Sequence, residues 1–233
     1  MKIRQPSTSI IIRTRNEERW ITPCFEALFN QSFQNFEIVV VDNESTDKTL
    51  DKIRQFPVEK IITIGDYLPG KALNLGIEKA VGHYIVCLSA HCIPVNSEWL
   101  ETLMKTLDGG EQYAGVYGRQ EPMSFTPPAD RRDLMLVFGL DRKIQRKDSF
   151  FHNANSIIRR TCWEKVHFDQ KITNIEDRIW AQEMLNLGYQ IIYEPEASVY
   201  HYHGIHQDRN EERMLNVARI IESQPGHSKS GQI

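Results

Sequence analysis

The stretch that decides the fold is SIIIRTRNE, residues 9–17, in which a run of apolar residues ends in a polar loop. The chain repeats this arrangement twice, in FEIVVVDNESTD at residues 36–47 and in YIVCLSAHC at residues 84–92. Each apolar run is typical of a buried strand. Because parallel strands of an open sheet end at one edge, where such folds bind ligands, the three polar loops predict one shared binding site.

Composition narrows the class of protein. The chain has 233 residues, of which 40% are hydrophobic, so we expect one large α/β domain or such a domain with a modest appendage. The net charge of −3 gives no electrostatic reason to expect nucleic acid as a partner. No apolar run approaches the length of a membrane span, and residues 1–7 do not resemble a signal peptide. The four cysteines lack paired metal-ligand spacing, which favours reduced thiols in a cytoplasmic protein.

Strands and helices alternate over the first hundred residues, which predicts a mostly parallel sheet with helices on both faces. Besides the opening strand, the expected strands are 36–42, 61–64, 84–88 and 114–118. The expected helices lie around 19–31, around Leu50 and Ile53, over 73–82, and after Ser97, whose side chain can cap a helix.

The second half of the chain departs from this alternation. Residues 122–150 carry many charges and predict a loop followed by a helix with its apolar face at 134–140. This segment is either a solvated helix or a contact surface for an acceptor or an anionic membrane. The elements expected beyond it are a helix at 178–187 closed by Gly188, strands at 190–193 and 197–200, an amphipathic helix with Met214, Val217, Ala218 and Ile221, and a polar tail at 224–233.

Five segments follow one another along these elements: residues 9–17, VVVDNESTDKT at 39–49, GKALNLGI at 70–77, Glu176-Asp177, and residues 189–203. In this order they resemble the family 2 glycosyltransferases, inverting enzymes whose catalytic domain has the GT-A fold. The resemblance implies transfer of a sugar from a nucleotide-diphosphate sugar to a hydroxyl group of a glycan or a lipid-linked acceptor. Surface polysaccharide biosynthesis is the setting that it suggests.

The resemblance also implies how the chain is organised. It covers roughly residues 7–205 and implies a single Rossmann-like GT-A domain over residues 1–223, with a mostly parallel central sheet and helices on both faces. Within that domain we expect a nucleotide-binding half at 1–108 and a smaller acceptor-binding half at 109–223.

Nucleotide binding is expected at the ends of the first strands. The residues implied for it are Thr14, Arg15, Asn16, Glu17, Asp42, Lys71, Ser89, Ala90 and His91. Asp42 stands at a strand end, where its carboxylate can accept a hydrogen bond from a base N–H. The alternative is a cap on the next helix, a role that suits Ser45 or Thr46 better. Lys71 follows Gly70 at a helix start, which suits a diphosphate, and the alternative is an ordinary solvated lysine.

At residues 89–91 the chain departs from the family's Asp-x-Asp metal motif and reads Ser-Ala-His. One interpretation is that His91 and either His201 or His203 hold a divalent ion such as Mn²⁺ or Zn²⁺, since imidazole suits these ions better than it suits Mg²⁺. Another is that no metal binds and that Lys71, His91 and a later arginine neutralise the diphosphate directly. A third is a loop histidine without a chemical role. We expect no organic cofactor.

The acceptor side requires one general base for inverting transfer. The resemblance implies Asp177 for this role, and it implies sugar or acceptor binding for Glu176, Asn153 and Asn155. The alternative for the two acids is a charged first turn of a helix, and the alternative for the two asparagines is a turn.

Two other functions compete with glycosyl transfer. One is a glycosyltransferase-like binding protein that lost catalysis together with the Asp-x-Asp carboxylates. The other is a sugar-nucleotide pyrophosphorylase, which is less favoured because the opening strand lacks a Gly-rich loop. The charged segment at 122–150 and the lack of an apolar span suggest a cytoplasmic enzyme with peripheral contact at the inner face of a membrane.

Overall fold

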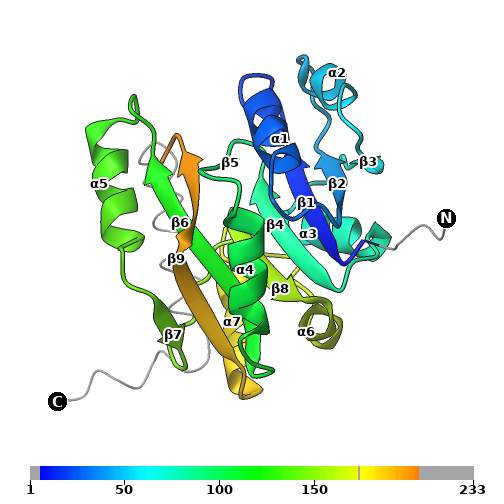
Figure 1. Cartoon of the computed structure of the whole chain (residues 1–233). Helices are drawn as coiled ribbons and strands as arrows, with labels where there is room; N and C mark the ends of the chain where they lie inside the picture. Colours follow the sequence, from blue (N-terminus) through cyan, green and yellow to red (C-terminus); the bar gives the residue numbers. More distant parts are fainter. Residues whose placement is uncertain (1–5, 173, 205–233) are drawn as a thin grey trace.

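The computed structural model describes residues 6–172 and 174–204 (Figure 1). The expected amphipathic helix around 214–221 and the expected tail at 224–233 lie outside the described residues. No helix within the described residues is long and apolar enough to cross a bilayer.

One mixed sheet organises the described part of the chain, with nine strands in the order β3-β2-β1-β4-β8-β6-β9-β5 and with β7 paired to β9. The strands are β1 (Thr8–Thr14), β2 (Phe36–Asp42), β3 (Lys60–Thr63), β4 (Tyr84–Ser89), β5 (Ile93–Pro94), β6 (Tyr113–Pro122), β7 (Lys143–Gln145), β8 (Asn155–Arg159) and β9 (Gln190–His201). β8 runs antiparallel to both β4 and β6, so β1, β2, β3, β4, β6 and β9 all point in one direction. The expected mostly parallel α/β sheet is therefore confirmed.

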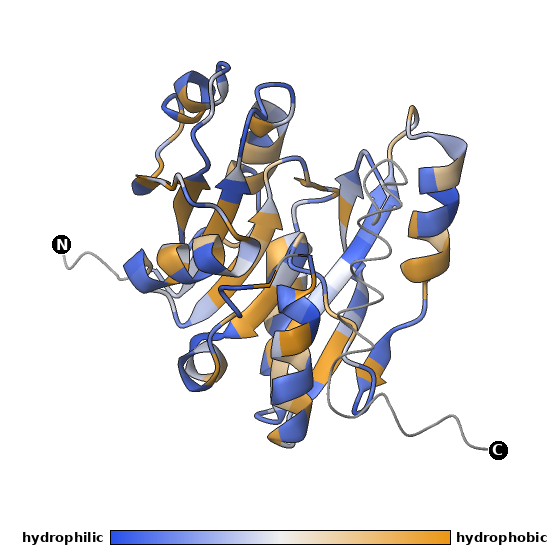
Figure 2. Ribbon diagram, turned by 180° about the vertical axis from the view of Figure 1, so that it is seen from behind, coloured by the Kyte–Doolittle hydropathy of each residue, from blue (hydrophilic) through white to orange (hydrophobic). Residues whose placement is uncertain are grey.

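Helices cover both faces of this sheet, as expected (Figures 1 and 2). They are α1 (Ile21–Phe29), α2 (Thr49–Ile53), α3 (Pro69–Lys79), α4 (Trp99–Asp108), α5 (Pro128–Val137), α6 (Arg160–Lys165) and α7 (Glu176–Asn186). Side chains alternate between the two faces along β1. Ile10 and Ile12 lie in one core with α1 and α4, while Ile11 lies in the other with α3 and α7. Burial on both faces explains the continuous apolar runs within β1, β2 and β4.

Close packing fixes α3 over the first strands. A Cβ atom on Gly76 would lie 2.6 Å from Ile11 Cγ2, so only glycine lets the helix approach β1 this closely. Earlier in the same helix, Asn74 Nδ2 donates to the Phe168 carbonyl at 2.8 Å, and Trp163 Nε1 donates to Asn74 Oδ1 at 2.9 Å. These contacts hold α3 in place against the sheet and the segment after α6.

Several expected boundaries need correction. α4 begins at Trp99 after Glu98, and no side chain caps it, so the role expected of Ser97 is wrong. The two strands expected around Pro195 form one strand, β9, whose pairing with β6 shifts register between Gly118 and Gln120. A proline has no N–H for the ladder, and the irregularity accommodates it. The short strands β5, β7 and β8 were not expected. Gly188 closes α7 with φ +85°, as predicted.

The charged segment also differs from expectation. α5 occupies its first half and β7 its second, where β7 pairs with β9. The apolar face expected at 134–140 is only partly buried: Leu134 and Phe138 are buried, but Leu136 and Leu140 are 76% and 72% exposed.

Candidate functional site

A cavity of about 350 Å³ lies at the carboxyl edge of the sheet, where the loops after β1, β2 and β4 meet. The segment before β8, the first turn of α7 and the end of β9 complete its wall. The lining residues are Arg13, Thr14, Arg15, Glu17, Asn43, Tyr67, Pro69, Ser89, His91, His152, Ala154, Asn174, Glu176, Asp177, His201 and His203. The three strand ends thus meet at one cavity, where ligands of open α/β sheets bind.

The cavity contains most of the site residues that the sequence suggested. Those that line it are Thr14, Arg15, Glu17, Ser89, His91, Glu176, Asp177, His201 and His203. Those that do not line it are Asn16, Asp42, Lys71, Ala90, Asn153 and Asn155.

Asp42 instead stabilises the loop after β2, and Asn16 connects that loop to the loop after β1. Asp42 is fully buried and accepts hydrogen bonds from the backbone N and the Oγ of Ser45, at 2.9 and 2.5 Å. Asn16 Oδ1 accepts a hydrogen bond from the backbone N of Thr46 at 2.8 Å. Asp42 therefore binds its own loop and does not cap the next helix, since α2 has Lys48 at its N-cap and no side-chain cap. Asn43 provides the cavity wall beside it.

The other four residues away from the cavity have local partners or lie in the core. Lys71 Nζ forms an ion pair with Asp66 at 2.5 Å. Ala90 is buried in the core that contains α1 and α4. The Asn155 amide accepts from Trp99 Nε1 and donates to two backbone carbonyls, which joins β8 to its neighbours. The backbone N of Asn153 donates to Asp177 Oδ2 at 3.1 Å, so Asn153 acts on the site through its main chain.

Three histidines form a cluster on one side of the cavity. The ligand atoms of His91, His201 and His203 all lie within 4.8 Å of one another. Neither ring nitrogen of the buried His201 has a hydrogen-bond partner. Burial, together with the neighbouring histidines, lowers the pKa of His201 well below its ordinary value, so its ring is neutral at physiological pH. A neutral, unpartnered imidazole beside two others fits a divalent cation that accepts nitrogen ligands.

Hydrogen bonds orient the other two rings. His91 Nδ1 lies 2.7 Å from Glu17 Oε1, and His203 Nδ1 lies 2.8 Å from the carbonyl oxygen of Gly204. Both partners are acceptors, so in the neutral form of each ring the proton is on Nδ1 and the lone pair is on Nε2. A carboxylate or a carbonyl behind a ligating histidine is the usual arrangement in metal sites.

The two acids face the cavity from the start of α7. Arg13 Nη1 forms an ion pair with Glu176 Oε1 at 3.2 Å, and both side chains are largely buried. Asp177 Oδ1 accepts a hydrogen bond from the backbone N of Arg178 at 2.8 Å. Burial, followed by the charge of Glu176, raises the pKa of Asp177 to about 7. A carboxylate with this pKa is suited to accept a proton near neutral pH.

Sequence reasoning missed several lining residues, of which Arg13 is the most informative. A charged residue within an otherwise buried strand was the signal, since such a side chain needs a partner. Its partner, Glu176, is 163 residues away, and spacing along the chain does not reveal such a contact. Tyr67, Pro69 and Asn174 show no periodicity that would have indicated them.

Comparison with known families gives one match that covers most of the chain. The model of "Glycosyl transferase family 2" matches residues 9–166. These residues include β1, β2, β4 and the first part of the histidine cluster.

Two curated relatives extend this match. One is the dolichyl N-acetyl-alpha-D-glucosaminyl phosphate 3-beta-D-2,3-diacetamido-2,3-dideoxy-beta-D-glucuronosyltransferase of Methanococcus voltae. The two sequences are 38% identical over 121 aligned residues, which cover 47% of this chain and 38% of the relative. The other is the O-antigen chain rhamnosyltransferase WbaN of Salmonella anatum. The two sequences are 28% identical over 213 aligned residues, which cover 85% of this chain and 67% of the relative. The chain thus spans only part of the length of these proteins.

A solved structure shares the fold. The mannosyltransferase PcManGT from Pyrobaculum calidifontis, in complex with GDP-Man and Mn²⁺, superposes with a TM-score of 0.70 at 20% identity. The superposition covers 94% of this chain and 65% of that one. At this identity the likeness shows the fold, which is the GT-A fold that the sequence resemblance implied.

Proposed function

The chain belongs to glycosyl transferase family 2, and on that premise we propose that it transfers a sugar, with inversion, from a nucleotide-diphosphate sugar to a hydroxyl group of a glycan or a lipid-linked acceptor. One observation carries the proposal. A single cavity is lined both by the acid pair Glu176–Asp177 and by the cluster of His91, His201 and His203. A reaction that needs a base at the acceptor and positive charge at the leaving group uses both groups at once.

Asp177 is the proposed general base. Its carboxylate takes the proton of the acceptor hydroxyl while the hydroxyl oxygen bonds to the anomeric carbon and the bond from that carbon to the diphosphate breaks. The pKa of about 7 leaves a large fraction of Asp177 ionised at neutral pH and makes it a stronger base than an exposed carboxylate. The hydrogen bonds from the backbone N atoms of Asn153 and Arg178 hold the carboxylate in position.

The histidine cluster is the proposed site for the leaving diphosphate. A divalent ion such as Mn²⁺, held by His91, His201 and His203, would balance the charge that develops on the diphosphate. Glu17 holds the His91 ring in the orientation that such an ion requires. Arg15 and Arg13 line the same cavity and add positive charge near the donor.

The donor, the acceptor and the cellular setting are inferred from similar proteins and are therefore proposals. We propose that residues 1–108 bind the nucleotide and residues 109–223 the acceptor, within one domain over 1–223. In that nucleotide-binding half, the loop that Asp42 and Asn16 stabilise holds the base. A relative named for an O-antigen chain and another named for a dolichyl phosphate derivative support a polysaccharide or lipid-linked acceptor.

Binding and turnover with a panel of donors test this function. We expect calorimetry to detect tight binding of one of the diphosphates of uridine, thymidine, guanosine or cytidine, with an affinity that rises when Mn²⁺ is added. The matching nucleotide sugar should then be consumed slowly by water and faster with a suitable acceptor. Absence of binding to every nucleotide with and without Mn²⁺ would refute the function. Equal affinity and activity under strong chelation would refute only the metal.

A second function is favoured by one observation, the loss of both Asp-x-Asp carboxylates at Ser89 and His91. In that case the chain is a nucleotide-sugar binding protein with weakened catalysis. Tight donor binding without hydrolysis, and without transfer to any acceptor, is the result that would select it.

A further inference from the structure

The edge of the molecule formed by α5 and β7 exposes large apolar side chains. Phe125, Met135, Leu136, Leu140 and Ile144 are between 45% and 76% exposed. Figures 1 and 2 show α5 and β7 together at one side of the molecule, beyond β6 and β9. We call this edge, residues 125–147, the α5 surface.

Helical spacing gathers part of the α5 surface on one face. Pro128, Arg131, Arg132, Met135 and Leu136 line one shallow hollow, as residues three to four apart on a helix do. The buried residues Asp130 and Leu134 lie on the opposite side of the same helix. α5 therefore turns Met135 and Leu136 outward while Leu134 packs into the core, whereas a surface helix of a folded domain normally turns its apolar residues to the core.

Basic side chains surround these apolar groups. The exposed cations of the α5 surface are Arg131, Arg132, Arg142, Lys143, Arg146 and Lys147. The exposed acids within or next to the same segment are only Asp141 and Asp148, although the whole chain has a net charge of −3. Two of the cations have acidic neighbours: Arg142 is paired with Glu194 at 3.1 Å and Arg132 lies 3.7 Å from Asp133. The excess positive charge is thus local to the apolar edge.

We propose that the α5 surface binds the headgroup region of an anionic lipid bilayer. Apolar side chains that enter the interface and cations that meet anionic headgroups are the two requirements for such binding. A second copy of the chain is a poorer occupant, because a two-fold contact would bring the same cations against each other. The segment at 205–233 has four basic and four acidic residues, so its charge offers no attraction to this surface.

The α5 surface adjoins the cavity. Phe125 stacks on Trp20, which belongs to the loop after β1, with ring centroids 5.8 Å apart. Thr126 Oγ1 donates to the carbonyl oxygen of Tyr202, the residue between His201 and His203. A bilayer at this surface would therefore lie next to the cavity, a position that suits a lipid-linked acceptor if the proposed function holds.

Vesicle flotation with the full chain tests the surface without any turnover. We expect binding to vesicles of equal parts phosphatidylcholine and phosphatidylglycerol, weaker binding at high salt, and little binding to phosphatidylcholine alone. The double variant Arg131→Glu/Arg132→Glu should weaken binding at least about tenfold, since each basic residue near an anionic surface contributes about fivefold. The double variant Met135→Ser/Leu136→Ser should also weaken it.

Matched controls lie elsewhere on the surface. Arg54→Glu/Lys79→Glu removes two exposed cations far from α5, and Leu187→Ser removes an apolar side chain that is 55% exposed. Both should bind like the parent chain, and all variants should keep its melting temperature, because every substituted side chain is exposed.

Three results would overturn the proposal. They are equal binding to both kinds of vesicle, no binding to either, and normal binding by the α5 variants. A dimer in solution that dissociates on Leu136→Ser would also overturn it, because it would make a second copy the occupant of this surface.

Discussion

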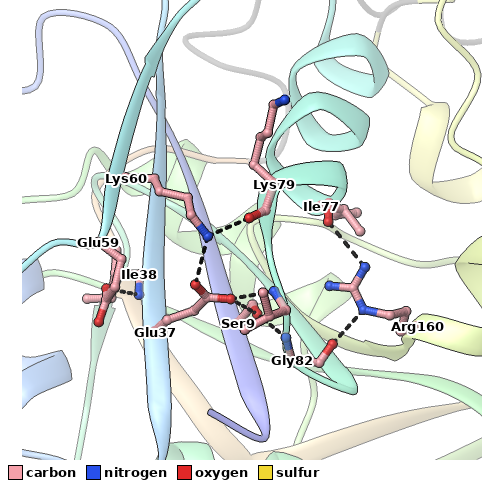
Figure 3. Close-up of polar contacts among 10 residues, drawn as sticks. Ser9, Glu37, Ile38, Glu59, Lys60, Ile77, Lys79, Gly82 and Arg160 are labelled. Carbon is pink, nitrogen blue, oxygen red and sulfur yellow. Dashed lines mark hydrogen bonds and ion pairs between the residues drawn. The ribbon is translucent and has the colours of Figure 1, made fainter. Parts of the chain in front are cut away.

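Among the described residues, polar side chains cluster at both edges of the sheet, but those at the amino edge are paired with one another, whereas several at the carboxyl edge have polar atoms without a partner. At the amino edge, where the parallel strands begin, Glu37 is 3% exposed and its polar contacts are paired (Figure 3). Glu37 Oε1 accepts hydrogen bonds from Ser9 Oγ at 2.7 Å and from the backbone N of Val81 at 2.6 Å, and Lys60 lies 3.4 Å from Oε2. The backbone N of Gly82 donates in turn to Ser9 Oγ at 2.8 Å.

The same network ties the ends of two helices to this edge. Lys60 Nζ donates to the carbonyl oxygen of Lys79, the last residue of α3. Arg160, the first residue of α6, donates to the carbonyl oxygens of Gly82 and Ile77. Among its described side chains, the only buried polar atom without a partner is Arg160 Nη2. Its other buried polar side-chain atoms are hydrogen-bonded or ion-paired within the chain, so this network stabilises the fold.

The carboxyl edge leaves polar groups without partners. Thr14 Oγ1, Asn153 Nδ2 and both ring nitrogens of His201 are buried there without a hydrogen bond. Two adjacent acids share one end of the cavity, and the pKa of Asp177 is raised. Unpaired groups and adjacent like charges cost stability, so their retention at one edge marks that edge as the place for a ligand.

The largest expected effect comes from Asp177→Asn. Loss of the base should lower kcat for transfer by about 10³-fold, while the affinity for the nucleotide diphosphate stays within about twofold. Single-turnover kinetics and calorimetry measure the two quantities separately. The matched control at the amino edge is Glu37→Gln, which should not change kcat per folded molecule. Near-normal turnover in the Asp177→Asn variant would remove this residue from the base role.

Asp177→Asn should also increase the stability of the folded state above neutral pH, whereas a substitution at the amino edge such as Glu37→Ala should decrease it. A carboxyl group whose folded pKa is raised from 3.8 to about 7 binds its proton more tightly in the folded state. The stability that the protonated Asp177 carboxyl contributes to the folded state is therefore lost as pH rises from about 4 to about 7. Above that range the ionised carboxylate favours unfolding. Above pH 7, Asp177→Asn should raise the melting temperature. A lower melting temperature would mean that the hydrogen bonds of Asp177 outweigh its buried charge.

The next largest effect should come from His201→Ala. It removes a buried, unpartnered imidazole, and the Mn²⁺-dependent part of the nucleotide diphosphate affinity should fall about 10²-fold. Calorimetry with and without Mn²⁺ measures this part by difference. His83→Ala is the control, because His83 is an exposed histidine at the amino edge. If the affinity of the His201 variant responds to Mn²⁺ as the parent does, the cluster holds no ion.

A stability effect should follow from Glu37→Ala. It leaves the hydroxyl of Ser9 and the backbone N of Val81 without their acceptor, at a cost of about 2–3 kcal/mol. Urea unfolding measures this cost, and kcat per folded molecule should not change. Glu59→Ala is a control from the same view (Figure 3), because Glu59 is exposed and makes one hydrogen bond, to the backbone N of Ile38. We expect it to cost about 1 kcal/mol, because it leaves one donor, the backbone N of Ile38, without its acceptor instead of two.

The sequence predicted the parts of the fold that depend on periodicity. Apolar runs such as residues 10–12 in β1 and 38–41 in β2, each followed by a polar loop, indicated a two-sided sheet and the edge where its site lies. The resemblance also named residues, including His91 and Asp177, that the fold brings to one cavity. β7 could not be predicted in this way, because three residues are too few to show a period and its partner β9 lies far along the chain.

The direction in which a side chain points was the other feature that the sequence could not predict. Asp42 was expected to face a nucleotide base, yet Ser45, three residues on, satisfies both of its oxygens. Spacing indicates which residues share an edge, but competition among nearby donors decides where each side chain points. Arg13 shows the converse, since its partner Glu176 comes close only when α7 packs against the sheet.

The smallest expected effect concerns this last contact, and it tests why the pKa of Asp177 is high. The value of kcat/KM should rise about tenfold per pH unit up to about pH 7 and then level off, because only the ionised base accepts a proton.

Burial is the larger cause of the raised pKa of Asp177, and the charge of Glu176 is the second. Glu176→Gln should therefore move the midpoint down by about one pH unit and leave it above the ordinary aspartate value. Glu183→Gln, on a later turn of α7, should leave the midpoint unchanged. A midpoint that does not move in the Glu176 variant would mean that Arg13 already neutralises Glu176, and that burial alone sets the basicity of Asp177.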